Sequence, residues 1–93
     1  MEQNYEEAAR LFALAASTGL AAAEFNLGSL YERGLGVPKD YAKALAYYRA
    51  AAEQGNAPAK VRVGLFFEKG WSVPVNQAEA MRWYLAAAEF CRT

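Results

Sequence analysis

Few residues in this sequence carry chemistry, and their spacing matches no catalytic or metal site. There is no histidine, which excludes histidine-based triads and histidine-containing metal sites. The single cysteine, Cys91, has no histidine to activate it, so a surface or half-buried thiol is favoured over a nucleophile. The acidic pair Glu6 and Glu7 falls in the first turn of a predicted helix, where it complements the helix dipole. Glutamate and lysine could still act as acid and base, but no such residues converge in the pattern. We therefore expect no enzyme, no metal and no other cofactor.

A glycine-rich segment, Gly34-Leu35-Gly36, could be interpreted as a phosphate cradle. No third glycine follows it at the required spacing, no Gly-Lys-Ser/Thr run follows, and no strand is predicted before it. These glycines therefore indicate a turn between two helices rather than a nucleotide site.

Composition narrows the class of protein further. The chain has 93 residues, 55% of them hydrophobic, which indicates one small folded domain. Ten basic and ten acidic residues cancel, so nothing favours binding to nucleic acid or to a membrane. No secretory signal and no apolar run long enough to cross a bilayer is present. We expect a soluble chain that is cytoplasmic by default, with a periplasmic or secreted location open if it is a fragment.

The positions that organise the chain recur every thirty-six residues. Ala15-Ala16 recurs as Ala51-Ala52 and again as Ala87-Ala88. Glycines recur at the same spacing, Gly28 as Gly64 and Gly34 as Gly70. A period of this length is typical of a solenoid, in which each unit buries its apolar face against its neighbours.

Two kinds of helix alternate in the predicted repeat. First-type helices, expected over 5–18, 41–54 and 77–90, follow the cap residues Asn4, Asp40 and Asn76. Second-type helices are expected over 21–33 and 57–69. No strand pattern competes, so the predicted fold is all-α, an α/α superhelical solenoid of antiparallel helix pairs with about five helices. Gly28 and Gly64 fall inside second-type helices, which predicts a close approach of two helices, with the alanine pairs as the complementary surface.

Several of these residues together resemble the Sel1-like repeat, a branch of the tetratricopeptide-like α-solenoids. The resemblance rests on Leu27-Gly28, Leu30-Tyr31, the run Gly34–Val37, Tyr47-Tyr48 and the run Ala51–Gly55. It covers nearly the whole chain, 1–93, as a single domain of about two and a half repeats. It implies a non-catalytic scaffold that binds a protein partner or a peptide segment.

The sequence departs from the repeat in two places. Gly70-Trp71-Ser72 replaces Gly34-Leu35-Gly36, so the second loop is expected to differ in turn geometry. Cys91 stands where earlier units have a glycine, so the last helix lacks its usual stop.

Candidate binding residues are those that differ between copies on the side of the second-type helices away from the core. In related repeats these helices line the concave side. Trp71 is added because it either plugs the junction between repeats or presents an exposed anchor, two alternatives that the sequence leaves open. The candidate partner-binding residues are Phe25, Asn26, Ser29, Glu32, Arg33, Val61, Arg62, Leu65, Lys69 and Trp71, with Glu68 beside them.

The two ends of the array suggest an alternative role. On the first helix, Leu11, Phe12 and Leu14 are expected to have fewer neighbours than their counterparts inside the array. On the last helix, Trp83, Tyr84 and Leu85 are expected to have no following unit beside them. Solenoids normally need polar capping faces. The chain is then either a structural slice of a larger solenoid or a stack that self-associates through its terminal helices, with no partner site of its own.

Overall fold

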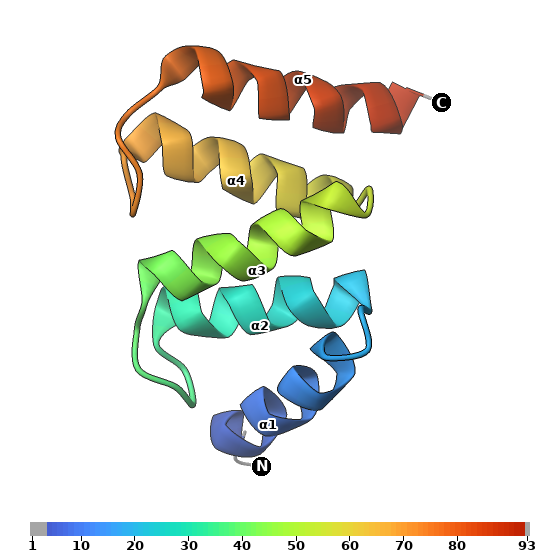
Figure 1. Ribbon diagram of the computed structural model, residues 1–93, viewed down its shortest axis with the longest axis vertical. Helices are drawn as coiled ribbons and strands as arrows, with labels where there is room; N and C mark the ends of the chain where they lie inside the picture. Colours follow the sequence, from blue (N-terminus) through green and yellow to red (C-terminus); the bar gives the residue numbers. More distant parts are fainter. Residues whose placement is uncertain (1–3, 93) are drawn as a thin grey trace.

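The computed structural model describes residues 4–92, and the side chains of residues 4–89. Within these residues the secondary structure is helical, with no strand, which confirms the predicted all-α solenoid. Figure 1 shows the helices stacked one after another along the long axis of the molecule, with α1 and α5 at the two ends. The helices are α1 Tyr5–Ala16, α2 Ala21–Arg33, α3 Tyr41–Glu53, α4 Ala57–Lys69 and α5 Gln77–Arg92.

Helix starts are fixed by side chains that accept a hydrogen bond from a free backbone N–H group. Asn4, Asp40 and Asn76 act in this way on α1, α3 and α5, at donor–acceptor distances of 3.0, 3.1 and 3.0 Å. Asn56 does the same for α4 at 2.9 Å, a cap that the sequence pattern did not indicate. The first-type helices α1, α3 and α5 therefore all begin with a side-chain N-cap.

Helix ends differ slightly from the expected bounds. Helix α1 stops at Ala16, because the hydroxyls of Ser17 and Thr18 donate to carbonyls one turn back and close the helix early. Helix α5 continues to Arg92, beyond the expected end. The side chain of Cys91 lies outside the described residues.

The loop after α4 has the same geometry as the loop after α2, contrary to expectation. Gly36 has φ +76° and the equivalent Ser72 has φ +69°, so both residues are left-handed. A Cβ atom on Gly36 would collide with the backbone carbonyl of Tyr5, which explains glycine there. Ser72 adopts the same conformation at the cost of strain that glycine avoids.

Gly28 and Gly64 mark close helix contacts, as predicted, but the partner is not the one expected. A Cβ atom on Gly28 would lie 3.0 Å from the ring of Tyr48 and 3.2 Å from the carbonyl oxygen of Ala44. Gly64 meets the ring of Tyr84 in the same way. The alanine pairs were therefore wrongly assigned as the complementary surface, since a tyrosine ring fills that role.

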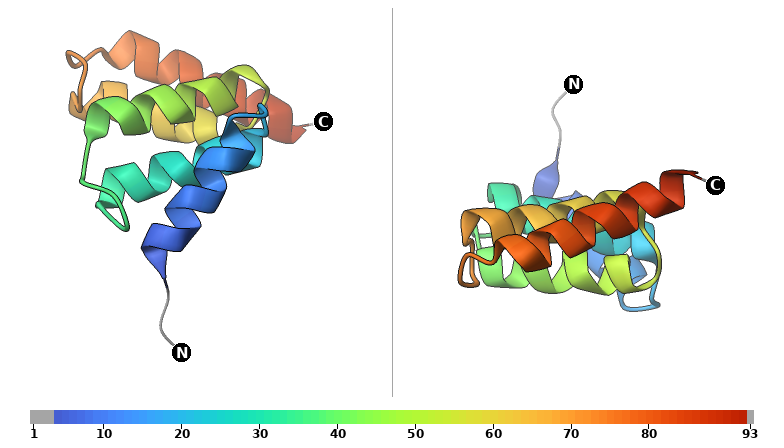
Figure 2. Two further views of the ribbon diagram at one scale, coloured as in Figure 1. Left: turned by 60° about the horizontal axis from the view of Figure 1, so that its bottom comes forward. Right: turned by 90° about the horizontal axis from the view of Figure 1, so that it is seen from above.

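Two groups of buried side chains hold the stack together. The larger lies between α3 and α4 and includes Tyr48, Val63 and Phe66, each fully buried. The smaller joins α1 and α2 around Leu27 and Leu30. Figure 2 shows α1 lying at a steep angle to the other helices, so this end of the stack is splayed. Each helix contacts the next along the chain, which makes the fold a linear array.

Candidate functional site

The candidate residues of α2 and α4 form two matching rows, one on each helix. Residues spaced three or four apart share a helix face, so 25, 26, 29, 32 and 33 follow one side of α2 and 61, 62, 65, 68 and 69 the equivalent side of α4. Of these, Arg33, Val61, Glu68 and Lys69 are exposed and the others are half-buried.

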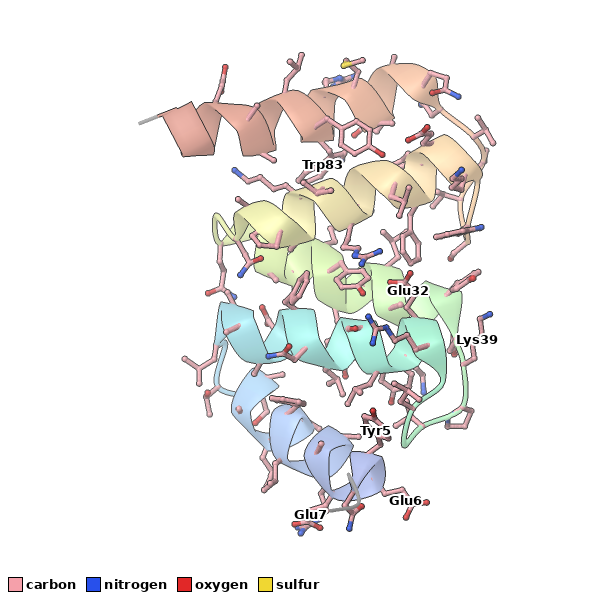
Figure 3. All side chains as sticks on the ribbon, turned by 180° about the vertical axis from the view of Figure 1, so that it is seen from behind. Tyr5, Glu6, Glu7, Glu32, Lys39 and Trp83 are labelled. Carbon is pink, nitrogen blue, oxygen red and sulfur yellow. The ribbon has the colours of Figure 1, made fainter. Side chains whose placement is uncertain are left out.

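Glu32 and Arg62 are joined in a contact that links three helices. The hydroxyl of Tyr48 on α3 donates to Oε1 of Glu32 on α2 at 2.6 Å. Nη1 of Arg62 on α4 lies 3.5 Å from Oε2 of the same carboxylate. The Glu32 side chain is only 17% exposed and that of Arg62 is 37% exposed. Figure 3 shows Glu32 between α2 and the helices that follow it.

The surroundings of this contact change the acidity of Tyr48. Burial and the hydrogen bond to Glu32 raise the pKa of the Tyr48 hydroxyl well above its ordinary value, and the Arg62 charge opposes this in part. The tyrosine therefore stays protonated and remains a donor to the carboxylate. Because one carboxylate satisfies a phenol and a guanidinium together, its first role is to fix α2, α3 and α4 relative to one another.

The hydrogen bond from tyrosine to glutamate recurs one repeat later, but among the described residues the ion pair with arginine does not. The hydroxyl of Tyr84 donates to Oε1 of Glu68 at 2.6 Å, again across sixteen residues. Burial, followed by the hydrogen bond to Glu68, raises the pKa of Tyr84 to about 12. Glu68 makes no ion pair within the described part of the chain. In the first unit Phe12 stands in place of the tyrosine, so that unit has no such hydroxyl.

Phe25 and Trp71 are used for packing inside the molecule. The ring of Phe25 lies 5.4 Å from that of Tyr48, centroid to centroid. Trp71 stacks on Tyr41 at 5.1 Å and meets Phe66 edge-on at 5.4 Å. Of the two alternatives for Trp71, the plug at the repeat junction is the one observed, and the exposed anchor is not.

The remaining candidates lie on α2 and α4, where Arg33, Val61 and Lys69 are exposed and Asn26, Ser29 and Leu65 are half-buried. We call them together the α2–α4 surface. Val61 and Leu65 give it an apolar strip, and Arg33 and Lys69 place one basic group on the last turn of each helix. Such a surface can hold a peptide by apolar contact and bind its carboxylates. It consists of Asn26, Ser29, Arg33, Val61, Leu65 and Lys69.

Glu32 was a candidate residue, but its contacts with Tyr48 and Arg62 were not predicted from the sequence. Glu32 and Glu68 are identical residues thirty-six apart, and so are Tyr48 and Tyr84. A recurring acidic residue together with a recurring tyrosine was the signal available. Arg62 was selected correctly as different from its equivalent, but its charge is turned inward to Glu32.

Two negative findings apply to the described residues. They contain no group of three or more side chains able to hold a metal ion. No helix among them has both the length and the apolar character needed to span a bilayer.

Comparison with known proteins identifies the repeat. The model of the Sel1 repeat matches residues 1–20, 21–56 and 57–89. The chain superposes on a Sel1 repeat protein from Oxalobacter formigenes with a TM-score of 0.91 and 41% identity, over 97% of this chain and 37% of that one. It also matches a protective antigen of uropathogenic Escherichia coli with an SLR fold, at a TM-score of 0.92 and 30% identity, over 96% of this chain and 19% of that one. No curated protein matches the sequence.

Both solved structures are much longer than this chain, which spans 37% of the first and 19% of the second. The match to the repeat model, in contrast, extends along nearly all of the sequence, and its divisions fall between α1 and α2 and between α3 and α4. Identity, superposition and repeat boundaries agree, and the chain belongs to the Sel1 repeat family.

Proposed function

We propose that this chain is a non-catalytic protein-interaction module that holds a partner segment on the α2–α4 surface. Sel1 repeat proteins generally act as scaffolds for protein interactions, which supports the class of function but names no partner. The observation that carries the proposal is the contrast between two sets of side chains on the same helices. Glu32 and Arg62 form an ion pair with each other, while Arg33, Val61 and Lys69 of the α2–α4 surface are exposed.

This arrangement favours binding because the surface is held before a partner arrives. Ordering loops and side chains at an interface costs free energy, and a preorganised surface avoids part of that cost. The bond from Tyr48 to Glu32 and the pair from Glu32 to Arg62 fix the spacing of α2 and α4. A partner segment with acidic groups at the spacing of Arg33 and Lys69 fits this surface best.

The test is comparative capture of partners from the source cell. Arg33→Glu with Lys69→Glu reverses two exposed charges without touching the Glu32 contact. The matched control, Arg10→Glu with Arg82→Glu, makes the same change in net charge on α1 and α5, where each arginine pairs only with a glutamate of its own helix. We expect a protein retained by the wild type and the control and lost by the surface variant. Equal retention by all three, or none by any, contradicts the proposal.

Phe25 and Arg62 are unsuitable positions for this test, because both side chains make contacts inside the molecule. Replacing Phe25 and Arg62 would remove a ring from Tyr48 and an ion pair from Glu32. Lost binding in such a variant would report instability as well as recognition.

A second candidate function is self-association through the terminal helices. It is favoured by exposed leucines at both ends, Leu11 and Leu14 on α1 and Leu85 on α5. Phe12, by contrast, packs against Leu27 and Leu30 and is not free. Sedimentation velocity at several concentrations separates the two functions, because a strict monomer across the micromolar range contradicts the self-associating stack.

A further inference from the structure

The outer face of α5 has the same arrangement as the face of α3 that receives α4. On α3 that face is made by Leu45, Tyr48 and Ala52, which are buried in one cluster with Ala59, Val63 and Phe66 of α4. The equivalent positions on α5, thirty-six residues later, are Met81, Tyr84 and Ala88. Met81 is 55% exposed, Ala88 is exposed and Tyr84 is half-buried. Helix α5 therefore has a face equivalent to the one on α3 that packs against α4, and no helix of the described residues covers it.

An apolar hollow of about 430 Å³ lies beside this face, between α4 and α5. In the preceding unit the equivalent alanines, Ala51 and Ala52, are covered by the larger core cluster. The hollow is thus the place into which a further helix would settle. It is lined by Ala57, Pro58, Val61, Tyr84, Ala87 and Ala88.

A helix that covers α5 must also complement a charged group beside the hollow. In the inner unit the carboxylate of Glu32, held by Tyr48, receives Arg62 from the helix that covers α3. In the outer unit Glu68 is held by Tyr84 at the same 2.6 Å and is exposed. A helix covering α5 in the same way would bring its own residue equivalent to Arg62 to Glu68.

We propose that the outer face of α5, together with Glu68, binds an amphipathic helix of a partner protein that repeats the pattern of α4. That pattern is a small residue, an arginine three positions later, an apolar residue next, and an aromatic three positions after that, as in Ala59, Arg62, Val63 and Phe66. This is a helix-in-groove mode of recognition, in which anchors spaced along one helix face enter an apolar groove. It is a different site from the α2–α4 surface, with which it shares only Val61.

A second copy of this chain fits the face less well. Its α1 exposes Arg10, Leu11 and Leu14, which match the arginine and the two apolar positions. However, Glu7 stands where α4 has the fully buried Ala59, and it already pairs with Arg10. Burying that carboxylate against an apolar face is costly.

The probe is a fluorescent peptide with the sequence of residues 56–70, stapled between positions 61 and 65. These positions lie four apart on the side of the helix opposite Val63, so the staple leaves the docking anchors free. Circular dichroism first establishes that the peptide is helical. Fluorescence anisotropy with the full chain then measures binding, and we expect saturation below about 1 mM. A helical peptide that gives no saturable binding overturns the proposal.

Charge reversal locates the peptide. The peptide with Arg62→Glu should bind about tenfold more weakly, and the protein variant Glu68→Arg should reverse this preference. Equal affinities in all combinations would contradict the charge assignment and with it the proposal.

Two further measurements separate other occupants and sites. The surface variant Arg33→Glu with Lys69→Glu should bind the peptide no more weakly than wild type, and loss of binding there would place the peptide on the α2–α4 surface instead. Without peptide, the chain should sediment as a monomer. A dimer that Met81→Glu abolishes would make a second copy the occupant and refute the proposal.

Discussion

A hydrogen bond from a tyrosine hydroxyl to a glutamate occurs twice in this molecule, once inside the stack and once at its end. Comparing the two shows how much this bond stabilises the fold at each place. We predict that Tyr48→Phe destabilises the protein more than Tyr84→Phe does. Both hydroxyls donate to a glutamate at 2.6 Å, and both substitutions keep the ring and leave no cavity. The two sites differ in burial and in the presence of Arg62.

The magnitudes follow from these surroundings. A hydrogen bond to a charged group contributes about 1.5 to 3 kcal/mol, and we expect Tyr48→Phe to lie in this range because Glu32 is largely shielded from water. Glu68 is exposed, so water replaces the lost phenol and Tyr84→Phe should cost about 0.5 to 1 kcal/mol. A difference of about 1 kcal/mol corresponds to roughly 4 to 8 °C in Tm for a domain of this size.

The assay is urea unfolding followed by circular dichroism at neutral pH. Tyr47→Phe is the control, since its hydroxyl makes no hydrogen bond to another described residue. Costs that agree within about 0.3 kcal/mol, or a larger cost for Tyr84→Phe, would refute the reasoning, because burial would then not determine the strength of the contact.

Two more predictions follow from the loops and the tyrosines. Ser72→Gly should raise stability by about 0.5 to 1 kcal/mol in urea unfolding because Ser72 is left-handed, whereas Gly36→Ala should lower it because a Cβ atom there meets backbone; no change in either variant contradicts the assignment of strain. The pKa values of Tyr48 and Tyr84 are raised in the folded state, so their stabilising contribution is complete below about pH 10, the ordinary pKa of tyrosine, and is lost as the pH rises toward 12 and beyond. The urea midpoint of wild type should therefore fall more steeply above pH 10 than that of the variant carrying both phenylalanines, and equal slopes would contradict this.

The architecture was predictable because local signals agree with one another. Asn4, Asp40 and Asn76 each precede an apolar helical pattern and each caps a helix in the structure. The repeated glycines predicted close helix contacts, and Gly28 indeed lies against a neighbouring helix. These features depend on a few residues of local sequence, which a single chain displays directly.

The candidate site was less predictable, because its state depends on contacts between distant residues. Nothing local to Arg62 indicates that its guanidinium turns toward Glu32, thirty residues earlier. Likewise, Trp71 in a loop can face solvent or core, and only the packing of Tyr41 and Phe66 around it decides. The second loop was expected to differ because Ser72 replaces Gly36, and a positive φ is rare for a residue other than glycine, yet Ser72 adopts one.

The proposed function requires that a partner is recognised by the α2–α4 surface, whose residues lie on the same helices as Glu32 and Arg62. The most direct measurement is the Kd of a captured partner for wild type, for Arg33→Glu with Lys69→Glu, and for Glu68→Arg. We predict affinity at least about tenfold weaker for the first variant, and unchanged affinity for Glu68→Arg. Wild-type affinity in the variant carrying both reversed charges, with binding lost only in Glu68→Arg, would contradict the claim and move recognition to the outer face of α5.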